Sequence, residues 1–237
     1  MKKKRLASIK RTLRHMTPRH IVKSRMTSGT IKRFADRIGL VYFGYVDQKD
    51  DDHRLVRGHT VSSSHIDKNY CVGSLRGYDV SLVSRNDVVM SKDMKREERC
   101  HWLIATIDLK TKVDIPHFYI GHDSRKQVFA SSFKSLMPLT PQVLSEYPKQ
   151  FLDHYIVYGR PTHAAYLGLL IVDQIAEVIT AHFKHTSIEV EDNCVYLYIE
   201  SEHPTEVLLE KTMSNGLWIA EAIDMRAEQL LGAGVSG

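Results

Sequence analysis

Two hairpin patterns constrain the fold of this chain more than any other feature. The segments "NYCVGSLRGYDVSLVS" (69–84) and "TSIEVEDNCVYLYIES" (186–201) each hold two runs of aromatic and β-branched residues around a turn. In the second segment Val195, Leu197 and Ile199 fall on alternate positions, which is typical of a strand with one buried face. Hairpins pair their strands antiparallel, so the chain is predicted to contain antiparallel sheets.

Helical patterns fall irregularly between the strand patterns. The spacing of apolar residues predicts a short helix at 31–39, a central helix at 125–136, a helix at 162–183 and a long C-terminal helix at 203–231. Further strands are expected at 40–46, 101–110, 115–122 and 151–160. The regular strand–helix alternation of a doubly wound parallel sheet is missing. We therefore predict an α+β fold with mostly antiparallel sheets, a central helix and a long C-terminal helix.

The charge is distributed very unevenly along the chain. Residues 1–37 contain 13 Lys or Arg and one acid, Asp36, whereas the remainder contains 20 basic and 27 acidic residues. The first part therefore carries +12 and the rest −7, which together give the net charge of +5. We predict a basic flexible arm at 1–26, an α+β region at 27–140, and a strand–helix–hairpin–helix region at 141–231 packed with it as one body.

The arm is the predicted functional site. Leu6, Ile9, Leu13 and Met16 recur at helical spacing. Two interpretations stay open: a disordered, soluble tail, or an amphipathic helix that folds on an anionic surface. The residues predicted to bind that surface are the ten basic residues of the arm: Lys2, Lys3, Lys4, Arg5, Lys10, Arg11, Arg14, Arg19, Lys23 and Arg25.

The stretch "VDIPHFYIGHDSRK" (113–126) has the composition of a metal or catalytic site. If it is a strand, His117 and Tyr119 point to one face while His122 points to the other. Asp123 or Ser124 is then explained as the N-cap of the central helix. We therefore expect no transition metal at His117, His122 and Asp123.

A second polar stretch, "RGHTVSSSHID" (57–67), holds His59, His65 and Asp67 around three serines. A hydrolase triad could be imagined here, but triad residues meet in space and not in sequence, so a polar loop is the simpler interpretation. The GxxxxGK[ST], GxGxxG, GxSxG and HExxH patterns are all missing. We expect no catalytic residue, no metal site and no cofactor.

The cellular context follows from two further features. The chain has three scattered cysteines and no CxxC pair, which is typical of a reducing compartment. No run of about 18 apolar residues could span a bilayer as a helix, and the basic N-terminus is not followed by the apolar region of a signal peptide. A cytoplasmic protein is expected, with possible peripheral attachment to the inner face of the membrane.

Several segments resemble a bacterial domain family of unknown function. The matching segments are "FLDHYIVYGRPTHAAYLGLLIVDQIAEVI" and "NCVYLYI", with "VGSLRGYDVSLV" and "IPHFYIGH" upstream. The resemblance therefore spans about residues 40–231. It implies an aromatic strand, a helix, a hairpin and a terminal helix in that order. Many members carry membrane segments before this domain, where the present chain has its basic arm. The resemblance supplies no catalytic residues.

The leading prediction is a non-enzymatic protein that associates with an anionic surface, the cytoplasmic face of the membrane, through the basic arm. A nucleic-acid-binding protein that uses the same arm is the first alternative. A hydrolase or metal enzyme that uses the His and Asp loops is the second.

Overall fold

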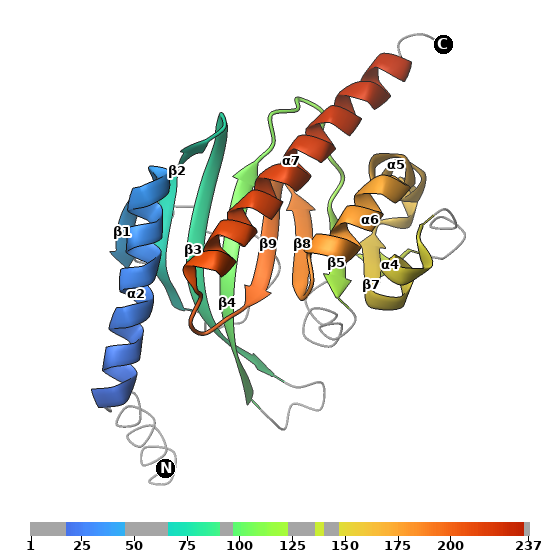
Figure 1. The fold of residues 1–237 in the computed structure, drawn as a ribbon. Coiled ribbons are helices and arrows are strands. Elements are labelled where there is room, and N and C mark those ends of the chain that lie inside the picture. Colours follow the sequence, from blue (N-terminus) through green and yellow to red (C-terminus); the bar gives the residue numbers. More distant parts are fainter. Residues whose placement is uncertain (1–17, 46–65, 91–96, 123–135, 140–146, 235–237) are drawn as a thin grey trace, which may run out of the picture.

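The computed structural model describes residues 18–45, 66–90, 97–122, 136–139 and 147–234 (Figure 1). Within these residues, nine strands form a single antiparallel sheet in the order β1-β2-β3-β4-β9-β8-β5-β7-β6. The predicted α+β fold is confirmed. The strands are β1 (Val41–Tyr45), β2 (Ile66–Leu75), β3 (Tyr78–Met90), β4 (Glu97–Asp108), β5 (Phe118–His122), β6 (Met137–Pro138), β7 (Tyr155–Gly159), β8 (Thr186–Glu191) and β9 (Cys194–Glu200).

Both predicted hairpins are present. β2 and β3 are joined by Arg76 and Gly77, and β8 and β9 by Asp192 and Asn193. All four of these turn residues have positive φ, between 50° and 74°. Positive φ at both central positions gives a two-residue turn the twist that matches its flanking strands.

The sheet interleaves distant parts of the chain. β4 pairs with β9, although about 90 residues separate them in sequence, and β5 lies between β8 and β7. The two regions predicted at 27–140 and 141–231 therefore contribute strands to the same sheet.

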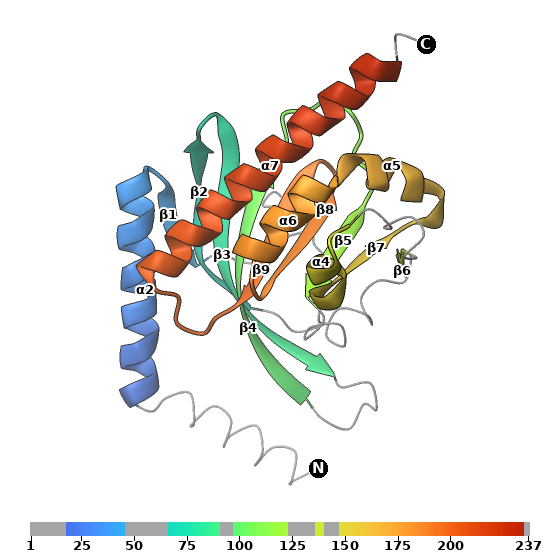
Figure 2. The same cartoon turned by 45° about the vertical axis from the view of Figure 1, so that its right-hand side comes forward.

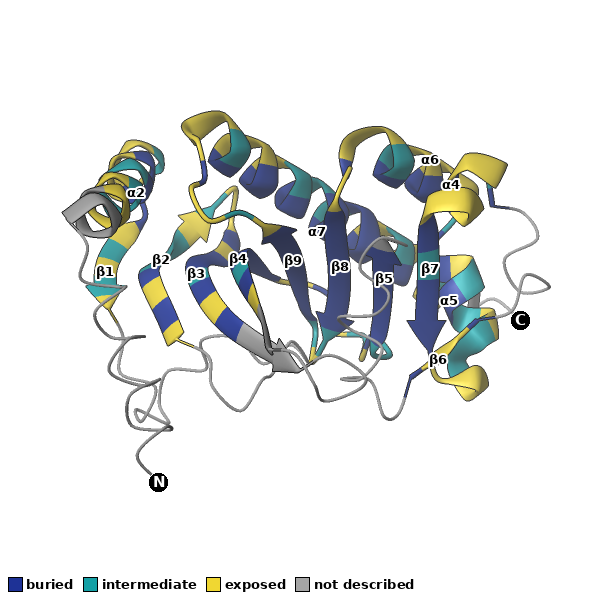
Figure 3. Ribbon diagram, turned by 90° about the horizontal axis from the view of Figure 1, so that it is seen from below, coloured by how far each residue is buried: buried dark blue, intermediate teal, exposed yellow. Residues whose placement is uncertain are grey.

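The helices gather largely on one face of this sheet (Figures 1, 2 and 3). In Figure 2, α7 crosses the central strands diagonally with α6 beside it, and α2 runs along the edge at β1. The described helices are α2 (Pro18–Ile38), α4 (Lys149–His154), the 3-10 turn η2 (Pro161–His163), α5 (Ala164–Leu170), α6 (Asp173–His182) and α7 (Glu206–Gly234).

Two element boundaries differ from the sequence prediction in ways that matter for the packing. α2 begins at Pro18 and not near residue 31, so its first turns fall within the segment predicted as a flexible arm. Residues 149–154 are helical and β7 begins only at Tyr155. In this segment Phe151 is fully buried and stacks on Tyr155 at 5.2 Å between ring centroids. Tertiary packing of one aromatic residue thus overrides the local strand propensity.

The helix predicted at 162–183 is broken into η2, α5 and α6, with 81° between the two halves. Leu170 ends α5 and Ile175 lies in the first turns of α6, and both are buried in the core. The break at Ile171 and Val172 lets residues of both halves pack into the same core. The central helix predicted at 125–136 lies almost wholly outside the described residues.

The main hydrophobic core lies between the helices and the sheet. A row of buried apolar residues crosses five neighbouring strands of the sheet: Leu82, Ala105, Leu197, Ile188 and Ile120. Each of them lies on the face that the helices cover. Because strand side chains alternate between faces, the intervening residues point to the opposite face, which is described below.

Two residues fix α7 on the sheet. Gly216 faces Ile107 and Leu197, and a Cβ atom built on it would lie 2.5 Å from Ile107 Cδ1. The carboxylate of Asp224 accepts hydrogen bonds from the backbone N–H groups of Lys110 and Thr111 and from the hydroxyl of Tyr78. The long C-terminal helix therefore docks through one close approach and one buried polar contact.

None of the described helices is by itself long and apolar enough to cross a membrane. The bent pair Pro161–Leu170 and Asp173–His182 meets the length and composition criteria when both parts are taken together. Leu167, Leu170 and Ile175 of this pair are buried in the core.

Candidate functional site

The second half of α2 is anchored to the body. Ile31, Phe34 and Ala35 are spaced on one side of the helix and are almost completely buried. Gly39, with φ of 82°, ends the helix, and the N–H of Leu40 bonds to the carbonyl of Ala35 at 2.9 Å. These apolar contacts hold α2 against β1 and β2.

Polar contacts connect the same half of α2 with α7. Arg37 Nη1 lies 2.6 Å from Glu210 Oε1, and Arg33 Nε lies 3.7 Å from Glu206 Oε1. Thr27 Oγ1 is 2.9 Å from His203 Nδ1 in the segment that precedes α7. These pairs are exposed and each contributes little to stability. They do neutralise the positive charge of this half of the helix.

The first half of α2 differs in its charge. Its first turns extend past the end of β1 in both views (Figures 1 and 2). Lys23 and Arg25 are exposed there and form no ion pair with a described residue. Arg19 belongs to α2, but its side chain lies outside the described part. The other predicted surface-binding residues, from Lys2 to Arg14, also lie outside it.

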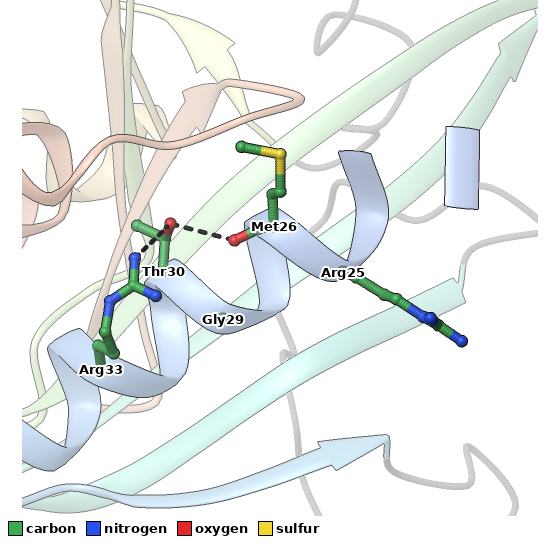
Figure 4. A pocket seen from close by; sticks show the side chains of 5 residues that line it. All are labelled: Arg25, Met26, Gly29, Thr30 and Arg33. Atoms are coloured by element: carbon green, nitrogen blue, oxygen red, sulfur yellow. Dashed lines mark hydrogen bonds between the residues drawn. The ribbon is translucent and has the colours of Figure 1, made fainter. Parts of the chain in front are cut away.

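An open hollow of about 340 Å³ lies on α2 at the junction of the two halves. It is lined by Arg25, Met26, Gly29, Thr30 and Arg33. Figure 4 shows Arg33 turned toward Thr30, whose oxygen accepts a hydrogen bond from Nη2 at 3.3 Å, whereas Arg25 extends away from both. The Thr30 hydroxyl donates to the carbonyl of Met26 at 3.1 Å. The described lining holds two guanidinium groups: Arg33 is shared with Glu206, whereas Arg25 forms no ion pair with a described residue and can attract an anion.

The opposite face of the sheet is rich in tyrosine and carries buried charges. We call it the tyrosine-rich face. Tyr196 and Tyr198 are stacked with ring centroids 6.4 Å apart, and Tyr119 and Tyr158 are 5.9 Å apart. The members of this second buried cluster are Val83, Cys100, Trp102, Ile104, Tyr119, Leu136, Tyr158, Cys194, Tyr196 and Tyr198.

A buried carboxylate occupies the middle of this face. Glu189 in β8 is 0% exposed and has a partner on each oxygen. The hydroxyl of Tyr198 donates to Oε2 at 2.7 Å, and His117 Nε2 lies 2.8 Å from Oε1. Burial, and then the adjacent Glu189 carboxylate, raises the pKa of Tyr198 well above its usual value. Tyr198 therefore remains a hydrogen-bond donor at neutral pH.

A second carboxylate approaches the same histidine. Glu191 Oε1 lies 3.8 Å from His117 Nδ1, so the imidazole ring lies between two glutamates. One ligand atom from each of His117, Glu189 and Glu191 can be chosen so that all three atoms lie within 4.8 Å of one another. Arrangements of one imidazole and two carboxylates are found in metal sites and in hydrogen-bonded networks.

A buried ion pair lies on the same face at β2 and β3. Arg85 Nε and Nη2 donate to the two oxygens of Asp67 at 2.7 and 2.8 Å, and both side chains are 2% exposed. Such a bidentate pair has a fixed geometry. Asp67 is therefore a structural partner of Arg85. The other members of the imagined triad, His59 and His65, lie outside the described residues.

The sequence prediction for the 113–126 stretch holds in part. His117 and Tyr119 do share a face, because His117 contacts Glu189, which pairs with Tyr119 across the ladder. Phe118 and Ile120 lie in the core on the other face. The side chain of His122 and all of Asp123 are outside the described part.

Sequence reasoning missed Glu189 and Glu191 as partners of His117. They lie 72 and 74 residues after His117 in the sequence, where the pattern indicates only ordinary polar positions of a hairpin. The alternation in "IEVED" does place Glu189 and Glu191 on one face. The pairing of β5 with β8, however, has no local signal in the sequence.

Comparison with known proteins gives a structural likeness without a sequence match. No family model matches the chain, and no curated protein matches it. The chain is similar in structure to the mycobacterial trehalose monomycolate transport factor A, TtfA. The two structures agree with a TM-score of 0.56 over 85% of this chain and 94% of that one, at 12% identity. At this identity the comparison concerns the fold alone.

Proposed function

We propose that the protein is a non-enzymatic, peripheral membrane protein that binds the anionic cytoplasmic face of the bilayer through the basic segment 1–26. The observation that supports this most directly is the asymmetry of α2. One half of the helix packs on the body and pairs Arg33 and Arg37 with glutamates of α7, whereas the other half presents Lys23 and Arg25 to solvent.

The anchoring of α2 gives the basic segment a defined direction. Residues 1–26 contain ten basic residues and no acid. The last nine residues of this segment, 18–26, belong to α2. Since α2 is fixed on the body by Ile31, Phe34 and Ala35, residues 23–26 are not free to fold back on the acidic remainder. A fixed helix keeps the positive end apart from the body, which carries −7 outside residues 1–37.

The energetics favour an electrostatic attachment. Each basic residue near an anionic leaflet contributes about 1 kcal/mol, and salt screens this attraction over a Debye length of about 8 Å at physiological ionic strength. Met26 is 67% exposed next to Arg25 and would add apolar contact at the interface. Attachment should require anionic lipid and weaken steeply as salt is added.

The hollow on α2 fits the same role. Its two arginines offer guanidinium donors of the kind that a lipid phosphate accepts. Gly29 adds no side chain at its centre, so a headgroup can approach the backbone of the helix. From TtfA, which is named for trehalose monomycolate transport, we take the fold and no ligand.

Co-sedimentation with vesicles tests the proposal. The full chain should pellet with phosphatidylserine-containing vesicles at low salt and stay in the supernatant with phosphatidylcholine alone. The double reversal Lys23→Glu, Arg25→Glu should weaken binding at least about thirtyfold, because two attractive contacts of about 1 kcal/mol each are lost and replaced by repulsion. The reversal Lys184→Glu, Lys211→Glu changes two exposed lysines elsewhere by the same net charge and serves as the control.

The nucleic-acid alternative is tested with the same proteins. Nucleic acid would give the same salt trend, so salt alone does not decide. A mobility-shift assay on duplex and single-stranded nucleic acid is run beside the vesicle assay. Tight binding to nucleic acid together with no pelleting on anionic vesicles would replace the membrane proposal by the alternative. Equal loss of vesicle binding in both double variants would show that only net charge matters.

A further inference from the structure

The strand register brings His117, Glu189 and Glu191 together independently of side-chain rotamers. β5 pairs with β8 so that Tyr119 lies opposite Glu189 and Phe118 opposite Val190. Continued by one residue, this register sets His117 opposite Glu191. Side chains alternate along both strands, so His117, Glu189 and Glu191 all fall on the tyrosine-rich face.

The charges of this cluster are not balanced by its own members. His117 carries at most one positive charge, whereas the two glutamates together carry two negative charges when ionised. Glu189 is 0% exposed, and the side chains of His117 and Glu191 are 11% and 23% exposed. Two carboxylates held this close in a poorly hydrated place repel each other, and a divalent cation between them removes that repulsion.

The buried carboxylate is already oriented as a metal ligand requires. Tyr198 donates to Glu189 Oε2 and leaves Oε1 directed at His117. Outer partners of this kind, which fix the angle of a ligating carboxylate, are a general feature of metal sites. The partial exposure of His117 and Glu191 gives an ion access from solvent and leaves room for water as a further ligand.

We propose that His117, Glu189 and Glu191 form a binding site for one divalent transition-metal ion of the zinc class. One imidazole nitrogen and two carboxylate oxygens are ligands that Zn²⁺ accepts in sites with three protein ligands and an open position. An imidazole ligand disfavours Mg²⁺, which prefers oxygen and retains its water.

The site is distinct from the cluster His117, His122 and Asp123, for which the sequence predicted no metal. The proposal also departs from the broader expectation that the chain has no metal site, because Glu189 and Glu191 reach His117 only across the sheet. The site also does not depend on the proposed membrane attachment, because α2 lies on the other face (Figure 3).

Zinc titration of the untagged full chain, stripped with EDTA, tests the proposal. Isothermal titration with ZnCl₂ should show one tight site per chain, and the thermal unfolding midpoint should rise with zinc and not with MgCl₂. X-ray absorption at the zinc edge should report one imidazole among nitrogen and oxygen ligands.

Two variants and a matched control identify the residues. Glu191→Gln and His117→Gln should each lower zinc affinity at least about tenfold, the effect expected even of an outer partner. Glu191 is partly exposed, so its variant should remain folded by circular dichroism. The control is Glu202→Gln with His203→Gln, an exposed His–Glu pair 3.8 Å apart outside the site, which should leave the affinity unchanged. The absence of a stoichiometric site in the folded wild type, or wild-type zinc affinity in both site variants, overturns the proposal.

Discussion

Asp224 is the residue that joins the C-terminal helix to the rest of the sheet. Its side chain accepts from two backbone N–H groups and one tyrosine hydroxyl, and it is only 6% exposed. All three donors are partly or fully buried. Their hydration is lost on folding, so the carboxylate compensates for polar groups that would otherwise be unsatisfied.

Asp224→Ala should therefore be strongly destabilising. It leaves Lys110 N–H, Thr111 N–H and the Tyr78 hydroxyl without their acceptor, and a loss of about 2–4 kcal/mol in the free energy of unfolding is expected. Equilibrium urea unfolding measures it, with the exposed Asp153→Ala as control, expected within about 0.5 kcal/mol of wild type. A loss below 1 kcal/mol for Asp224→Ala would show that water replaces the carboxylate.

The cysteines are buried residues without redox access. Cys71 is 0% exposed, and burial, together with the Asp36 carboxylate, raises the pKa of its thiol from 9.0 to about 12. The folded protein should thus react with a thiol reagent such as DTNB at pH 8 only after unfolding, when three thiols per chain are titrated. Fast labelling of the native chain would contradict the burial.

Because the pKa of the Cys71 thiol is raised, we expect the protein to lose stability at alkaline pH. Below pH 9 the thiol is neutral in both the folded and the unfolded state, so its contribution to the free energy of unfolding is fully present. As pH rises from 9 to about 12 the unfolded chain ionises first, so the folded state loses stability in this window. Urea unfolding at pH 8 and pH 10.5 should show the decrease, and Cys71→Ala should reduce its slope.

At the scale of secondary-structure elements, Gly216 shows why a helix that long retains a glycine in its interior. Glycine costs about 1 kcal/mol in a helix relative to alanine. In α7 it permits the helix to approach Ile107 and Leu197 of the central strands. Both of these contacted side chains are fully buried.

Gly216→Leu should destabilise the protein by about 1–3 kcal/mol through overpacking. The control is Gly232→Leu in the same helix, where a Cβ atom meets nothing within 4 Å. Chemical denaturation of both variants measures the difference. If the two variants unfold at the same denaturant concentration, then α7 can shift on the sheet without cost.

At the scale of the whole molecule, the basic N-terminal segment and the hydrophobic core belong to different parts of the chain. In α2 the buried residues begin at Ile31, whereas the first 26 residues of the chain contain ten basic residues and no acid. The first 26 residues can thus be removed without removing a buried described side chain. The remainder keeps every described strand.

Deleting residues 1–26 should leave a cooperative thermal transition with a similar midpoint. The deletion removes ten basic residues and no acid, which changes the net charge from +5 to −5. The truncated chain should therefore no longer pellet with anionic vesicles. Loss of the cooperative transition would show that the N-terminal segment packs into the core. Retained vesicle binding by a folded truncated chain would contradict the proposed function.

The sequence by itself determined the local structure with strong patterns. The hairpins at 69–84 and 186–201 follow from alternation and from turn residues that tolerate positive φ. The C-terminal helix follows from its apolar spacing, and the charge asymmetry from composition. These features depend on neighbours within a few residues, so a single sequence contains them.

Only the tertiary structure decided which strands pair and what meets on each face. The contact of His117 with Glu189 requires β5 to lie beside β8, and that of Asp67 with Arg85 requires one register of β2 on β3. The break at Ile171 and Val172 and the helix at 149–154 also depend on packing. The physical reason is the same in each case: the burial of apolar side chains against distant partners is stronger than the local preference of the backbone.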